Sequence, residues 1–218
     1  MYHLIRDYID LILGSIDPKR DVDPYIFLVK TFPNVDVSKN EHFQNVFRRY
    51  WQLNQSRMSR AFLQSFFELL EGPKCDKNIS PEWITRKLYA IPTQRQRQTV
   101  QFSFSTKLYH TLHPNAPVYD SSVEAFFFLP RSPAQKQKDV QQHLDRNLKR
   151  LLPAYEFLHR EYARILQKGL LDQPIAEFRS RYDLGTAIAR EKIIDTLIWK
   201  FVGFVKGGAI RNGRVIFS

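Results

Sequence analysis

Apolar residues recur at helical spacing along most of this chain, whereas the alternation typical of a strand is scarce. The pattern therefore predicts an all-α fold. Helices are expected over residues 4–13, 38–53, 59–70, 133–169 with a bend at Pro153, and 187–206. Residues 25–31 are compatible with helix or strand, and the tail over 210–218 is compatible with a small strand.

Capping and breaking residues indicate where some of these helices end. Gly72 and Pro73 stop the 59–70 helix, and Ser80 before Pro81 starts another helix that reaches about Tyr89. No repeat or low-complexity linker interrupts the chain. We therefore expect a single domain over residues 1–218, built from two helical lobes.

Aromatic residues are concentrated in the first half of the chain, at spacings that suit packing between helices. We interpret them as core residues, and they are Phe43, Phe47, Tyr50, Trp51, Phe62, Phe66 and Phe67.

The net charge of the chain indicates what kind of partner it binds. A formal net charge of +11 and a pI near 9.8 favour an acidic partner such as nucleic acid. No apolar run reaches the roughly 18 residues that a membrane span needs, and Arg6, Asp7 and Asp10 make the start unlike a signal peptide. We expect a soluble, cytoplasmic monomer with no membrane contact. The single Cys75 and the scattered histidines predict no metal and no cofactor.

One lysine falls on an apolar helix face. In a helix over 99–112 that face is formed by Val100, Phe104, Leu108 and Thr111. Lys107 lies in its middle, so its amine either reaches along the surface to water or enters a pocket. In a pocket, desolvation would lower the pKa of the amine from its usual ~10.4. A neutral amine could then attack an electrophilic carbon.

Asp120 is the candidate carboxylate partner of Lys107. It follows a proline-rich turn and opens the next helix, where Ser121 and Glu124 have the spacing of a capping box. Asp120 can cap that helix, or it can stabilise positive charge that develops near Lys107. The two roles are compatible.

A basic strip leads into this segment. No acidic residue occurs between Glu82 and Asp120. Within that interval we expect phosphate contacts from Arg95 and Arg97, assisted by Gln94 and Gln98, with aromatic rings available to stack on an extruded base. The alternative is an ordinary solvated loop.

Two short motifs carry a resemblance to a known family. They are Ser105-Thr106-Lys107 and the later Pro117-Val118-Tyr119-Asp120-Ser121-Ser122-Val123. Together they resemble the catalytic segment of the helix-hairpin-helix DNA glycosylase superfamily, and most of all its 8-oxoguanine glycosylase branch. Leu88, Ile91 and Pro92 resemble the start of the hairpin. The stretch 93–98, however, contains no glycine.

The resemblance implies a two-lobed helical fold and a DNA N-glycosylase with β-lyase activity that acts on a flipped, modified base. It implies Lys107 as the nucleophile that attacks C1′ and forms a Schiff base, and Asp120 as the assisting carboxylate. It implies DNA as the partner and no cofactor.

Two alternatives remain open. The first is a non-catalytic, basic DNA-binding protein of the same fold, which the missing hairpin glycines favour. The second is a protein-interaction module. We assign no functional role to six further residues. His110 and His113 are expected to be structural, and Lys192, Asp195, Trp199 and Lys200 have the spacing of surface pairs and one buried aromatic.

Overall fold

A computed structural model describes the chain apart from residues 54–57, 76–77, 93–97, 130–139, 212–213 and 216–218. The described residues are predominantly helical, which confirms the all-α prediction. The α-helices are α1 (Tyr2–Asp7), α2 (Ile9–Gly14), α3 (Asp23–Thr31), α4 (Glu41–Tyr50), α5 (Arg60–Glu71), α6 (Pro81–Tyr89), α7 (Phe102–Leu112), α8 (Ser121–Phe126), α9 (Val140–Gln167), α10 (Asp172–Arg181) and α11 (Arg190–Lys206). Shorter elements are the π-helix η1 (Pro18–Val22), the 3-10 helices η2 (Phe32–Asn34) and η4 (Gly72–Cys75), and the paired strands β1 (Ile210–Arg211) and β2 (Arg214–Val215).

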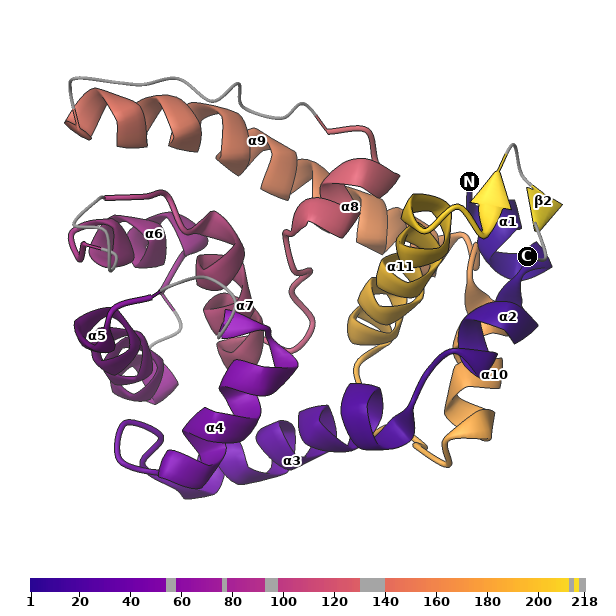
Figure 1. The fold of residues 1–218 in the computed structure, drawn as a ribbon, viewed down its shortest axis with the longest axis horizontal. Helices are drawn as coiled ribbons and strands as arrows, with labels where there is room; N and C mark the ends of the chain where they lie inside the picture. Colours follow the sequence, from indigo (N-terminus) through magenta and orange to yellow (C-terminus); the bar gives the residue numbers. More distant parts are fainter. Residues whose placement is uncertain (54–57, 76–77, 93–97, 130–139, 212–213, 216–218) are drawn as a thin grey trace.

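The helices form two groups that lie on opposite sides of the molecule (Figure 1). Helices α4 to α7 gather on one side, and α1, α2, α10 and α11 gather on the other. Helix α3 runs from one group to the other along one edge, and α9 runs along the opposite edge. Helix α8 packs on α11, and α6 packs on α7. The catalytic candidates on α7 and before α8 therefore lie where the two groups meet.

Local capping explains several helix boundaries. Ser80 accepts a hydrogen bond from the backbone N–H of Trp83 at 3.2 Å, so α6 begins and ends as predicted. Asn40 accepts from the N–H of Phe43 at 2.9 Å, and α4 consequently begins later than the pattern suggested. Residues 25–31 lie within helix α3 and do not form a strand.

Two features differ from the sequence-based expectation. The first predicted helix is divided at Tyr8 into α1 and α2. Helix α10 was not predicted. Helix α9 is described from Val140 and continues through Pro153, although a proline removes one helical hydrogen bond. The residues before Val140, where this helix was expected to start, lie outside the described residues.

The predicted aromatic core surrounds Phe47. The ring centroid of Phe47 lies 5.5 Å from that of Phe66 and 5.6 Å from that of Phe67. Trp51 packs against Phe47 at 6.3 Å, so the end of α4 is held by this cluster. Six of the seven predicted core aromatics are buried, whereas Tyr50 is half-buried.

No helix within the described part of the chain combines the length and the apolar character that crossing a membrane would require.

Candidate active site

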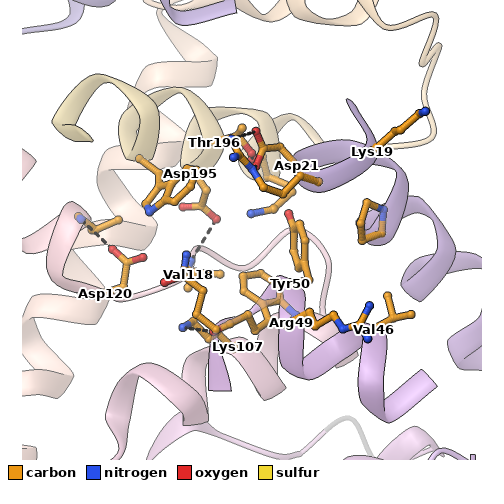
Figure 2. A pocket seen from close by; sticks show the side chains of 17 residues that line it. Lys19, Asp21, Val46, Arg49, Tyr50, Lys107, Val118, Asp120, Asp195 and Thr196 are labelled. Carbon is orange, nitrogen blue, oxygen red and sulfur yellow. Dashed lines mark hydrogen bonds and ion pairs between the residues drawn. The ribbon is translucent and has the colours of Figure 1, made fainter. Parts of the chain in front are cut away.

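A cavity of about 660 Å³ lies among residues of η1, α3, α4, α7, α8 and α11 and the loop that precedes α8. This volume is in the range of about 300–1,000 Å³ that is usual for ligand pockets. Its wall includes both catalytic candidates, Lys107 and Asp120. Figure 2 shows Lys107, Asp120 and Asp195 grouped around Val118.

The Lys107 side chain turns into this cavity. Its Nζ donates a hydrogen bond to the backbone carbonyl oxygen of Trp51 at 3.0 Å and lies 5.2 Å from the centroid of the Phe104 ring. Burial lowers the pKa of the Lys107 amine to about 8; the Asp120 charge opposes this lowering, and the Lys192 charge adds to it. A substantial fraction of the amine is therefore neutral near physiological pH.

Asp120 is the N-cap of α8. Its Oδ1 accepts hydrogen bonds from the N–H groups of Ser122 at 2.8 Å and Val123 at 3.0 Å. The predicted capping box of Ser121 and Glu124 is therefore wrong, because Asp120 is itself in the capping position and Glu124 accepts from the Tyr119 hydroxyl. Among the described residues, no hydrogen bond or ion pair joins Asp120 to Lys107.

Buried hydrogen bonds fix the loop that carries Asp120 against α7. Thr106 Oγ1 accepts from the Tyr119 N–H at 3.1 Å and lies 3.3 Å from the Tyr119 carbonyl oxygen. The hydroxyl of Tyr155 on α9 donates to the carbonyl of Pro117 at 2.9 Å. Thr106 and Tyr119 each precede a catalytic candidate, so this contact sets the relative position of Lys107 and Asp120.

His110 is part of the same buried framework. Its Nδ1 lies 2.6 Å from the carbonyl oxygen of Ala116, and its Nε2 lies 2.8 Å from the Tyr25 hydroxyl. Because a carbonyl only accepts, Nδ1 carries the proton and Nε2 accepts from Tyr25. Burial lowers the pKa of His110 to about 3. The histidine is neutral and joins α7 to α3 and to the loop.

Helix α11 also lines the cavity, through residues that include Lys192 and Asp195, to which no role was assigned from the sequence. Lys192 is 7% exposed and Asp195 is 5% exposed, so they are not the surface pair that their spacing suggested. Asp195 accepts from the Tyr162 hydroxyl at 2.5 Å and from the Val118 N–H at 3.3 Å. Burial raises the pKa of Asp195 to about 7, although the nearby Lys192 charge opposes this shift.

Trp199 and Lys200, the other two α11 residues considered in the sequence, also differ from expectation. Trp199 was expected to be buried, but it is 38% exposed and lines the cavity. Lys200 is buried and pairs with Asp21 at 2.6 Å, and it also donates to the carbonyl of Ser15. This pair anchors η1 to α11. The signal that could have identified these residues is the apolar character of 193–202 over most of its circumference, which is typical of a buried helix.

Cations at the edge of the cavity come from segments in which no phosphate contact was expected. Lys19 and Arg20 on η1 and Arg49 on α4 line the cavity and are exposed. The predicted phosphate contacts Gln94, Arg95 and Arg97 lie outside the described residues. Gln98 is described and half-buried, and it is not part of this cavity wall.

In the described part of the chain, no three histidine, cysteine or acidic side chains are arranged to hold a metal ion. Comparison of the chain with protein-family models, with curated proteins and with solved structures found no match.

Proposed function

We propose that this protein is a DNA glycosylase with associated lyase activity, related in fold to the helix-hairpin-helix glycosylases, and that it acts on a modified base flipped into the cavity. The observation that supports the proposal most strongly is the Lys107 amine: its pKa is lowered to about 8, and it lines a cavity together with Asp120.

In the proposed reaction, the Lys107 nitrogen attacks C1′ of the flipped nucleotide. A nitrogen–C1′ bond forms, and the bond between C1′ and the base breaks. The base leaves with the electron pair, and it takes up the proton that the lysine nitrogen gives up. Asp120 stabilises the positive charge that develops on the sugar. The sugar ring then opens as O4′ takes up a proton, which gives a protonated Schiff base at C1′. Loss of a proton from C2′ to solvent and breakage of the C3′–O bond release the downstream strand with its 5′ phosphate.

The edge of the cavity suits a nucleic-acid strand. Lys19 and Arg49 present exposed cations from two different elements, and phosphate contacts of this kind position a strand without reading its sequence. Trp199 offers a partly exposed ring on which a base can stack.

A duplex containing one abasic site tests the chemistry without knowledge of the natural lesion, because its sugar aldehyde forms a Schiff base with any suitably placed amine. Borohydride should trap wild-type protein on this duplex as a covalent adduct. Lys107→Gln should abolish the adduct, and Lys168→Ala, which removes an exposed lysine outside the cavity, should leave it unchanged. Equal trapping by wild type and Lys107→Gln would refute the proposal.

The rival function is a DNA-binding protein of the same fold without catalysis. It is favoured by the bond that ties Lys107 to the Trp51 carbonyl and by the absence of direct contact between the described Lys107 and Asp120 side chains. It predicts no adduct, together with salt-dependent duplex binding that Lys107→Gln barely changes. Lys19→Ala combined with Arg49→Ala would weaken binding and reduce the salt slope by about 2.

A further inference from the structure

Trp51 brings two lysine amines to one place from two different helices. Its carbonyl oxygen accepts the hydrogen bond from Lys107 on α7. Its ring lies 4.7 Å from the Nζ of Lys192 on α11. Both lysines line the same cavity. Burial lowers the pKa of each of them, so the environment disfavours two charged amines here.

Aromatic rings and carboxylates offset part of the effect of burial on the charge of Lys192. Three aromatic rings surround its Nζ, with centroids at 4.7 Å for Trp51, 5.4 Å for Tyr50 and 5.5 Å for Tyr25. A desolvated cation over an aromatic face gains about 2 kcal/mol. Asp195 lies one turn further along α11, and its charge raises the pKa of Lys192. Within the described chain, no hydrogen bond or ion pair uses this ammonium group.

The surroundings of Lys107 are less favourable to a charge. Its amine has the Trp51 carbonyl as its hydrogen-bond partner, and the two nearest ring faces are farther away, at 5.2 and 5.9 Å. A neutral amine can still donate that hydrogen bond, although more weakly than an ammonium. Three ring faces and two carboxylates act on Lys192, whereas two ring faces and one carboxylate act on Lys107, so the first proton of this coupled pair should leave from Lys107.

We propose that Lys192 is a positioning residue that holds a fixed positive charge beside Lys107 and thereby keeps the Lys107 amine in its neutral, nucleophilic form. The identity of the carbon that Lys107 attacks rests on the proposed function, but the coupling between the two lysines does not.

Other groups around the pair are compatible with this arrangement. Asp120 before α8 and Asp195 on α11 are the carboxylates that act on Lys192, and Asp120 also acts on Lys107. Tyr25, Tyr50 and His110 are neutral near pH 7, because burial raises the pKa of both tyrosines and lowers that of the histidine. The remaining charged residues of the cavity wall belong to η1 and α4. They are the cations Lys19, Arg20 and Arg49, and Asp21, which is paired with Lys200.

The test measures the reactivity of each lysine without DNA. The protein is treated with formaldehyde and cyanoborohydride between pH 6 and pH 11, and peptide mass spectrometry follows the initial labelling rate at Lys107 and Lys192. In wild type, the rate at Lys107 should rise with a midpoint near pH 8, below the midpoint at Lys192. A lower midpoint at Lys192 than at Lys107 would overturn the proposal. This comparison uses the wild-type protein alone.

Two variants separate charge from shape. Lys192→Met removes the charge and should raise the Lys107 midpoint by about one pH unit, which is a roughly tenfold slower reaction at pH 7. Lys192→Arg keeps the charge and should restore the wild-type midpoint. An unchanged midpoint in Lys192→Met, or an equal shift in both variants, would refute the charge coupling. Because no DNA is present, these results are independent of the abasic-site trapping.

Discussion

The amine of Lys107 donates a hydrogen bond to the backbone carbonyl oxygen of Trp51 at 3.0 Å. Trp51 follows α4 directly and packs against Phe47 in the aromatic core, so the position of the amine depends on residues far away in the sequence. The next residue, Gln52, has a left-handed φ of 57°, which turns the chain away from the helix. The Lys107 amine is in this way held by residues of the aromatic core.

The contact between Thr106 and Tyr119 should contribute measurably to stability. Thr106→Val keeps the shape of the side chain but leaves the buried Tyr119 N–H without its acceptor, at a cost of about 1–3 kcal/mol. Thr85→Val is the matched control, because Thr85 is equally buried but, among the described residues, its hydroxyl bonds only to the Pro81 carbonyl of its own helix. Denaturant unfolding of both variants measures the difference, and equal losses would contradict the assigned role.

Two substitutions at Asp120 separate its capping from its charge. Asparagine also caps helices well, so Asp120→Asn should leave the free energy of unfolding nearly unchanged, whereas Asp120→Ala should lower it by about 0.5–2 kcal/mol. Both variants should slow formation of the abasic-site adduct by about 10- to 100-fold, because both remove the charge. An Asp120→Asn variant with wild-type trapping kinetics would leave Asp120 with the capping role alone.

The buried Asp195 should make stability depend on pH. Its pKa is raised to about 7 in the folded protein, so between about pH 4 and pH 7 the folded state binds more protons than the unfolded state. The contribution of this group to stability is therefore lost as the pH rises through that window. The free energy of unfolding of Asp195→Asn, relative to that of wild type, should therefore increase by of order 1–4 kcal/mol as the pH rises from 4 to 8.

Chemical denaturation at several pH values measures this difference. Asp10→Asn, which removes an exposed carboxylate on α2, serves as the control and should follow the wild-type profile. Parallel profiles for wild type and Asp195→Asn would show that the carboxyl is not protonated in the folded protein at acidic pH.

Local signals in the sequence were sufficient for much of the fold. Helix α6 is encoded by a capping serine followed by a proline, and the structure has the predicted boundaries. The N-cap residue of a helix was harder to predict where two neighbouring residues both suit that position. Asp120 and Ser121 both suit the position, and the extended φ of −145° at Asp120 decides between them.

The cavity could be predicted only in part. Lys107 and Asp120 are close in sequence, so one turn places both in the wall of the same cavity. The lysine on an apolar face was visible in the helical pattern. Lys192 acquires its environment from Tyr25, Tyr50 and Trp51, which precede it by more than a hundred residues. No local pattern records such contacts. The expected phosphate contacts at Gln94, Arg95 and Arg97 stay predictions.

If Lys107 is the nucleophile, the borohydride-reduced adduct is on that residue, and its position on the chain can be determined. After trapping on abasic-site duplex and digestion of both protein and DNA, mass spectrometry identifies the lysine that carries the sugar remnant. In wild type, Lys107 should be the modified residue. A remnant on Lys192 or on an exposed lysine such as Lys168 would contradict it.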